Sequence, residues 1–182
     1  QIVRVVAEIF RSQIRPPLVV DPVMAATSGG RLLRPSAVKA LVDALLPSAL
    51  LVTPNLDEAR VLSGIRIESP EEMRAAARCI HRRSGCAVLL KGGHLRGLEE
   101  AVDIFYDGRN ELLLTAPFIR GISSHGTGCT YSAAITGYLA MGHSLLSAVK
   151  LGKEYITQAI SHHFRAAGHA VLNSFWRHKY LA

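Results

Sequence analysis

The sequence predicts an α/β domain with a largely parallel central sheet. Short apolar runs alternate with longer segments of helical periodicity, which is the pattern of repeated strand–helix units. The runs are continuous in apolar residues, as is typical of buried strands in parallel sheets. Polar residues follow these runs directly, and open α/β sheets bind ligands beyond the carboxyl ends of their strands. The sequence therefore indicates both a fold class and the sheet edge that carries a site.

The first half of the chain supplies the first strand–helix alternations. Pro16-Pro17 ends an amphipathic helix, Ser36 is the expected N-cap of the next helix, and Gly64 is the expected C-cap of a third. In chain order we expect a helix over 1–14, a strand over 18–20, a helix over 37–47, a strand over 49–53 and a helix over 55–64.

The second half begins with a strongly marked helix. Ser69 is its expected N-cap, Pro70 its first residue, and Glu71 and Glu72 place negative charge in its first turn. Its expected apolar face consists of Met73, Ala76, Ala77 and Ile80. After it we expect a buried strand over 86–90, a hairpin of strands over 101–108 and 111–117, and a mostly helical segment from Gly128 to the C-terminus with breaks at Gly142 and Gly168.

The composition is that of a globular protein with a substantial core. Of the 182 residues, 49% are hydrophobic and 19% are charged, a balance that excludes a disordered chain. No apolar run reaches the about 20 residues that span a bilayer. No repeat, linker or low-complexity tract divides residues 1–182, so a single domain with no membrane association is expected. Three cysteines without CxxC spacing suit a reducing, cytoplasmic location.

The formal charge of +7 invites a nucleic-acid interpretation. The basic residues are scattered, however, and their densest groups, Arg82-Arg83 and 177–179, are short. No RNA- or DNA-binding motif accompanies them, and a basic protein can equally serve phosphorylated small molecules. No nucleic-acid partner is therefore expected.

The segment that carries the most chemistry is Gly126-Thr127-Gly128-Cys129, a Gly-rich turn that runs into an apolar helix. The first amides of a helix lack intrahelical acceptors, so they can hold an anion or the charge that develops on a transferred phosphoryl group. Cys129 falls in the first helical turn, where the helix dipole favours a thiolate that can act as base or nucleophile. The structural alternative is a tight turn followed by a buried small residue. The segment is neither a Walker A loop nor a dinucleotide fingerprint.

Asn55 and Glu58 form a second candidate pair at the start of the predicted helix over 55–64. Residues three apart share a helix face, and an amide with a carboxylate suits a hydrated Mg²⁺ ion, which prefers oxygen ligands. The same two residues also fit a capping box, in which Asn is the N-cap and Glu the third helical residue. Both interpretations remain open from the residues alone.

Two further segments follow strands at the same predicted edge. Asp21 ends the first strand, ahead of Ser28-Gly29, and is suited to binding a metal or orienting a phosphate; an Asx-type turn is the alternative. Lys91-Gly92-Gly93-His94 places a cation and two glycines, which allow a ligand to approach the backbone closely, at the same edge. The alternative is that this segment forms only a solvated turn. Each signal is modest by itself, and their order along the chain is what makes them informative.

Taken in that order, five segments resemble consecutive blocks of the hydroxymethylpyrimidine/phosphomethylpyrimidine kinases, a ribokinase-like family. They are VVDPVMAATSGGRLL, LLVTPNLDEARVLSG, VLLKGGHL, VDIFYDG and SSHGTGCTYSAAITGYLAMG. The likeness runs from the first helix to the tail HFRAAGHAVLNSFW. The SHGTGC block is the most specific, because most ribokinase-like enzymes carry Asp where this branch carries Cys. The resemblance implies a three-layer α/β/α fold with a largely parallel central sheet.

The resemblance also implies a reaction, namely transfer of the γ-phosphoryl group of MgATP to hydroxymethylpyrimidine or to its monophosphate in thiamine biosynthesis. The partner is then a small pyrimidine alcohol or phosphate. Gly126, Thr127 and Gly128 would form the anion hole of this reaction. Cys129 would be the base that takes the proton of the substrate hydroxyl.

Two further groups of residues take their implied roles from the same resemblance. Both concern the cofactors, ATP and Mg²⁺. The magnesium and phosphate ligands would be Asp21, Asn55 and Glu58. The residues that border the nucleotide would be Lys91, Gly92, Val102 and Asp103.

Two departures from the family pattern bear on these implications. Family members begin with a Gly-rich strand and loop and further strands that bind the pyrimidine, and this block is absent. The resemblance therefore covers the nucleotide-binding portion, with the N-terminal strands missing, and the sheet edge left unpaired would favour a homo-oligomer such as a dimer. In the tail, Ala170, Val171 and Ser174 replace the Gly, Pro and His of the family.

Two alternatives to pyrimidine phosphorylation stay open from the sequence. A pyridoxal/pyridoxine kinase with the same Cys-type anion hole shares these segments, and the absent block is where the two substrates would be distinguished. A catalytically incompetent nucleotide-binding module is the other alternative. The absent block supports it, whereas the intact Asn55, Glu58 and GTGC residues oppose it.

Overall fold

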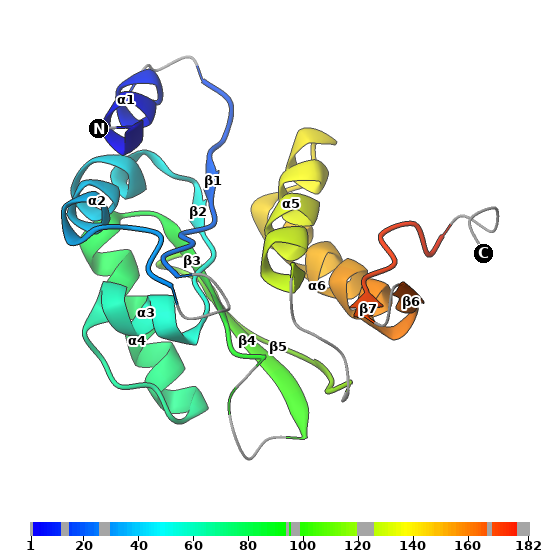
Figure 1. The fold of residues 1–182 in the computed structure, drawn as a ribbon. Helices are drawn as coiled ribbons and strands as arrows, with labels where there is room; N and C mark the ends of the chain where they lie inside the picture. The colour runs from blue at the N-terminus through cyan, green and yellow to red at the C-terminus, as the bar shows by residue number, and fades with distance from the viewer. Residues whose placement is uncertain are drawn as a thin grey trace. The chain divides into compact units, whose positions relative to one another are not determined.

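The structure is a computed structural model of the 182-residue chain, and it describes residues 2–11, 15–25, 30–93, 95, 99–119, 126–166 and 169–177. The chain divides into two compact units, unit 1 over residues 1–114 and unit 2 over 115–182 (Figure 1). The expectation of a single domain stays a prediction. In unit 1 and across its boundary the elements are α1 Ile2–Ile9, β1 Val19–Val20, α2 Pro35–Ala40, β2 Leu51–Val52, α3 Leu56–Ser63, α4 Pro70–Ser84, β3 Ala87–Lys91, β4 Glu100–Tyr106 and β5 Glu111–Pro117.

The sheet has the strand order β1-β2-β3-β4-β5. It is parallel from β1 to β3, with Val20 opposite Val52 and Val52 opposite Val88. It becomes antiparallel between β3 and β4, where Lys91 lies opposite Asp103. The three parallel strands end at one edge, so the segments that follow them meet there. The predicted α/β class, strands and hairpin are thereby confirmed.

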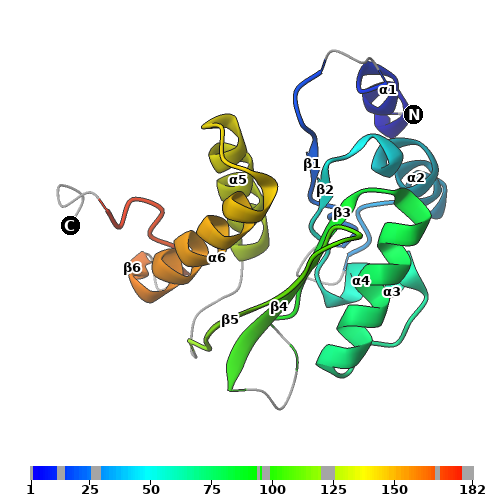
Figure 2. The same ribbon diagram turned by 180° about the vertical axis from the view of Figure 1, so that it is seen from behind.

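The helices of unit 1 lie along one face of the sheet, as the two opposite views in Figures 1 and 2 show. The core between them contains Val88 and Leu90 from β3 and Ile104 from β4. The face that α4 buries in this core is the one predicted from its spacing, namely Met73, Ala76, Ala77 and Ile80.

The helix ends in unit 1 follow the capping residues closely, with one exception. Gly64 ends α3 in the left-handed conformation at φ 75°, and Ser69 caps α4 by accepting a hydrogen bond from the amide of Glu72 at 3.2 Å. The prediction that Ser36 caps the next helix is wrong, because α2 already begins at Pro35. Proline suits the first helical position, where its missing N–H and fixed φ cost nothing. The chain then tightens through a π-helical turn, Leu41–Leu45, and a 3₁₀ turn, Leu46–Ser48.

Unit 2 pairs two helices and then turns back as a short hairpin. Its elements are α5 Thr127–Ala140, α6 Leu145–Ser161, β6 Phe164–Ala166 and β7 His169–Val171. The expected break at Gly142 is present, at φ 87°, whereas Gly168 lies outside the described residues. The prediction of a mostly helical tail is wrong beyond Ser161. The returning chain is instead held against α6, because Ala159 accepts the amide of Asn173 at 3.1 Å and Tyr155 donates its hydroxyl to Ser174 O at 2.6 Å.

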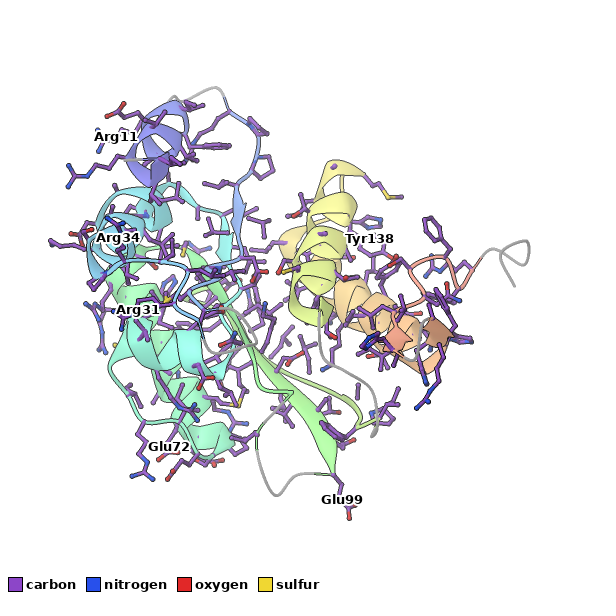
Figure 3. All side chains as sticks on the ribbon, in the orientation of Figure 1. Arg11, Arg31, Arg34, Glu72, Glu99 and Tyr138 are labelled. Carbon is purple, nitrogen blue, oxygen red and sulfur yellow. The ribbon has the colours of Figure 1, made fainter. Side chains whose placement is uncertain are left out.

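No helix in the part of the chain that the structure describes is long and apolar enough to cross a membrane. Several charged side chains lie on the outer surface of unit 1. Figure 3 shows Arg11, Arg34 and Glu72 on the outer side of α1, α2 and α4, away from the sheet.

Candidate functional site

Four polar residues meet at the carboxyl ends of β1, β2 and β3, and they are called the strand-end cluster below: Asp21, Thr53, Glu58 and Lys91. Asp21 directly follows β1, Thr53 follows β2, and Lys91 ends β3. The backbone holds these positions in register, because the Thr53 amide donates to Val20 O at 3.0 Å and the Lys91 amide donates to Pro54 O at 2.8 Å. The predicted sheet-edge location of Asp21, Glu58 and Lys91 is thus present in the structure.

An ion pair lies at the centre of the strand-end cluster. Lys91 Nζ donates to Asp21 Oδ1 at 2.9 Å, and the two side chains are only 11% and 18% exposed. Thr53 Oγ1 donates to the same oxygen at 3.1 Å. The Asx-type turn expected as the alternative role of Asp21 is not formed among the described residues, because the amide of Val23 donates to the backbone oxygen of Asp21, at 2.9 Å, and not to its carboxylate. The Asp21 carboxylate is therefore held by side chains from two other strands.

Asn55 and Glu58 form the capping box that their spacing predicts. Glu58 N donates to Asn55 Oδ1 at 2.9 Å, and Asn55 N donates to Glu58 Oε2 at 2.8 Å. Glu58 is buried at 6% exposure. Burial raises the pKa of the Glu58 carboxyl above its ordinary value, and the negative charge of Asp21 adds to this, while the hydrogen bond from Asn55 and the charge of Lys91 partly oppose it. The capping interpretation is confirmed, and a magnesium role is compatible with it.

The turn after β3 is fixed from β4. Gly92 N donates to Asp103 Oδ1 at 3.0 Å, and both Val102 and Asp103 are buried. A Cβ atom at Gly92 would lie 2.4 Å from Met73 Cε and from Val102 O, so no larger residue fits there without displacement. Asp103 thus holds the Lys91-Gly92 turn by a hydrogen bond, and the backbone oxygen of Val102 lies against Gly92. That these residues border a nucleotide stays a prediction.

In unit 2, the Gly-rich segment begins α5 as expected. Gly126 is the N-cap in the left-handed conformation at φ 80°, and its carbonyl accepts the amide of Thr130 at 2.8 Å. Thr127 and Gly128 are half-buried and Cys129 is exposed in the first helical turn. The alternative expectation, that Cys129 is a small residue buried in the protein, is wrong because its side chain is exposed in the first turn of α5. The amides of this turn have no acceptor within the helix itself.

Several residues singled out in the sequence lie outside the described residues: Ser28, Gly29, His94, Ser124 and His125. One functional candidate was missed, namely Thr53. Its signal is its place directly after a buried strand, at the edge where Asp21 follows the neighbouring strand. No motif distinguishes Thr53, because threonine is common in β-strands.

The donor set of the strand-end cluster fits a magnesium ion that is held largely by water and phosphate. Asp21 and Glu58 supply two carboxylates, and Asn55 adds an exposed amide. Within the described ranges, no three His, Cys, Asp or Glu side chains are grouped closely enough to cage a metal. Mg²⁺ ordinarily takes one or two protein carboxylates and completes its shell with water and substrate phosphates.

The sequence is similar to kinases of one family over nearly its whole length. A family model described as phosphomethylpyrimidine kinase matches residues 1–173. The hydroxymethylpyrimidine/phosphomethylpyrimidine kinase of Rhizobium meliloti (strain 1021) is 54% identical over 144 residues, which cover 79% of this chain and 54% of that protein. The chain thus spans about half the length of this relative.

Solved structures give the same result for the fold. The Staphylococcus aureus pyridoxal kinase in complex with AMP-PCP and pyridoxal matches with a TM-score of 0.87 and 32% identity, covering 98% of this chain and 65% of that one. The phosphomethylpyrimidine kinase of Clostridium difficile 630 matches with a TM-score of 0.74 and 38% identity, covering 87% and 64%. These likenesses confirm the ribokinase-like α/β fold class.

Proposed function

The chain belongs to the phosphomethylpyrimidine kinase family, and we propose that it serves the ATP-dependent phosphorylation of hydroxymethylpyrimidine or its monophosphate in thiamine biosynthesis. One observation within the molecule carries this proposal. The Lys91–Asp21 ion pair lies beside the buried Glu58 at the carboxyl ends of three adjacent parallel strands. An ammonium group with two carboxylates at that edge is suited to a triphosphate and its magnesium ion.

The residues of the strand-end cluster have different roles in this function. Lys91 supplies positive charge to phosphate oxygens as a point charge. Asp21 and Glu58 would hold the hydrated metal ion, and the capping box keeps Glu58 in place at the start of α3. Magnesium, when bound, would neutralise negative charge on the phosphates.

The first turn of α5 supplies the second part of the chemistry. The amides that follow Gly126 stabilise negative charge on the transferred phosphoryl group. The Cys129 thiolate accepts the proton of the substrate hydroxyl. A new bond forms between the substrate oxygen and the γ-phosphorus, the bond from that phosphorus to the β–γ bridging oxygen breaks, and ADP leaves.

A second substrate has a specific observation in its favour. The pyridoxal kinase structure is 32% identical and has the higher TM-score, 0.87 against 0.74. The family match and the 54% identity to the Rhizobium relative nevertheless favour the pyrimidine. Phosphorylation of pyridoxal is therefore the alternative that the same experiment must distinguish.

The experiment measures ADP release by the purified chain with MgATP and hydroxymethylpyrimidine, beside pyridoxal and a sample without acceptor. Pyrimidine-dependent release supports the proposal, and release that depends on pyridoxal alone favours the alternative. AMP-PCP binding is measured on the same sample. Binding without turnover means that this chain is a nucleotide-binding module, and absence of both overturns the proposal.

A matched variant tests the role of the metal. Glu58→Gln keeps a capping-box residue at the third helical position and removes the carboxylate charge. We expect it to raise the Mg²⁺ concentration needed for half-maximal AMP-PCP binding. An unchanged requirement would leave Glu58 with its capping role alone.

A further inference from the structure

Thr53 has a side chain that the proposed chemistry leaves unused, although it lies inside the strand-end cluster. The residue is completely buried directly after β2. Its hydroxyl lies 3.1 Å from Asp21 Oδ1 and 3.4 Å from Val20 O. Since an ionised carboxylate only accepts hydrogen bonds, the Thr53 hydroxyl is the donor in the shorter contact.

The two donors to Asp21 converge on one of its two oxygens. Thr53 Oγ1 and Lys91 Nζ both bind Oδ1, at 3.1 and 2.9 Å. Within the ranges that the structure describes, no hydrogen bond to Asp21 Oδ2 is formed. Donors from the ends of β2 and β3 therefore fix the Asp21 side chain and leave Oδ2 as the oxygen that a ligand can use.

We propose that Thr53 is a positioning residue, which holds the Asp21 carboxylate so that Oδ2 is available to the hydrated magnesium of a bound nucleotide. The ligand side of this inference rests on the proposed function. Threonine is well suited to the task because its branched Cβ restricts χ1 to few rotamers, and a completely buried side chain has few ways to move. Lys91 alone does not suffice, because a long flexible ammonium is a weaker orienting group than a hydroxyl fixed to a strand.

The test compares Thr53→Val, which keeps the shape and removes the donor, with Thr53→Ser, which keeps the donor. The control is Ser84→Ala, which removes another buried hydroxyl of unit 1 that bonds Ile80 O at 2.8 Å, outside the cluster. AMP-PCP binding is titrated with Mg²⁺ for all four proteins. We expect Thr53→Val to need about tenfold or more additional Mg²⁺, as fits the loss of one hydrogen bond to a charged group, while the other two stay close to wild type. A wild-type requirement in Thr53→Val, or an equal shift in Ser84→Ala, overturns the inference.

A second measurement needs no ligand and separates this inference from the proposed function. Three-bond NMR couplings report the χ1 rotamer of Asp21 in the ligand-free protein. We expect a single rotamer in wild type and Thr53→Ser, and rotamer averaging in Thr53→Val. If the wild type fails to bind AMP-PCP, the proposed function fails, and the couplings still decide whether Thr53 orients Asp21. A single unchanged rotamer in Thr53→Val overturns the inference.

Discussion

The strand-end cluster of unit 1 and the first turn of α5 in unit 2 carry their polar groups in opposite ways. The cluster is assembled from segments far apart in sequence, and its ion pair joins residues 70 positions apart. Its side chains are largely buried, and Asp21 is bonded to both Thr53 and Lys91. The α5 turn is one contiguous segment, in which Cys129 is exposed. The first site depends on the fold of unit 1, whereas the second lies at the start of a single helix.

The difference separates two kinds of substitution. In the cluster, removing one side chain leaves a partly buried partner without its counterpart, so stability and ligand binding change together. At Cys129, removing an exposed thiol leaves the backbone amides of the helix in place, so the chemical step should change most. The two sites should therefore respond differently to substitution.

The largest expected effect is on turnover in Cys129→Ala. If the thiolate is the base, its loss removes about a hundredfold or more of the rate, the usual contribution of general base catalysis. The free energy of unfolding and AMP-PCP binding should stay unchanged, because the side chain is exposed. Steady-state kinetics with urea unfolding measures both. Cys79→Ala is the control, since Cys79 lies on α4 and donates to Ser63 O. A matching loss of AMP-PCP binding would show that Cys129 is structural and would remove the contrast.

Lys91→Met should give the largest loss of stability. It removes the ammonium from a pair whose side chains are 11% and 18% exposed, and it leaves Asp21 with Thr53 as its one remaining donor among the described residues. We expect a loss of about 2 kcal/mol in the free energy of unfolding together with weaker AMP-PCP binding. Urea unfolding and a binding titration measure these losses.

The matched control is a second lysine–aspartate pair in the same unit. Lys39 and Asp43 are joined at 2.5 Å, but their side chains are 79% and 53% exposed. Lys39→Met should therefore cost less than about 1 kcal/mol, because water screens exposed ion pairs. Equal losses in the two variants would mean that burial does not distinguish the strand-end cluster from an ordinary surface.

The parts of the fold that the sequence predicted are those with local causes. Ser69 with Pro70 begins α4, Gly64 ends α3, and Asn55 with Glu58 forms a capping box, because each device acts within one helical turn. Apolar runs likewise placed the strands, since parallel strands are buried along their length.

The missed features depend on tertiary contacts. The β6–β7 hairpin forms where Asn173 and Ser174 bond back to α6, which no local pattern reveals. The role of Thr53 depends on the pairing of β1 with β2, which places its hydroxyl against Asp21. Residue types predicted the chemistry of the site, whereas strand register decides which atoms meet.

A helix cap bonded to the cluster and one away from it offer a smaller test. Asn55→Ala and Ser69→Ala each remove a side chain that accepts the amide three residues on, and each should cost about 1 kcal/mol in the free energy of unfolding. Only Asn55→Ala should also raise the Mg²⁺ requirement for AMP-PCP binding, because Ser69 caps a helix that carries no site residue. Urea unfolding and Mg²⁺ titration of both variants measure the two effects. A raised requirement in Ser69→Ala would mean that the metal response reports general instability.

The smallest expected effect is a pH dependence of opposite sign at two capping glutamates. Burial raises the pKa of Glu58 above 4.5, whereas hydrogen bonds from the Glu68 amide and the Ser69 hydroxyl lower the pKa of Glu72 below it. Wild type should therefore lose stability relative to Glu58→Gln as pH rises from 4.5 through the raised pKa, since the folded state holds that proton more tightly than the unfolded chain. Relative to Glu72→Gln, wild type should instead lose stability as pH falls below 4.5 through the lowered pKa. Urea unfolding of the three proteins across that range measures both slopes, and slopes of equal sign would show that the buried environment of Glu58 does not control its protonation.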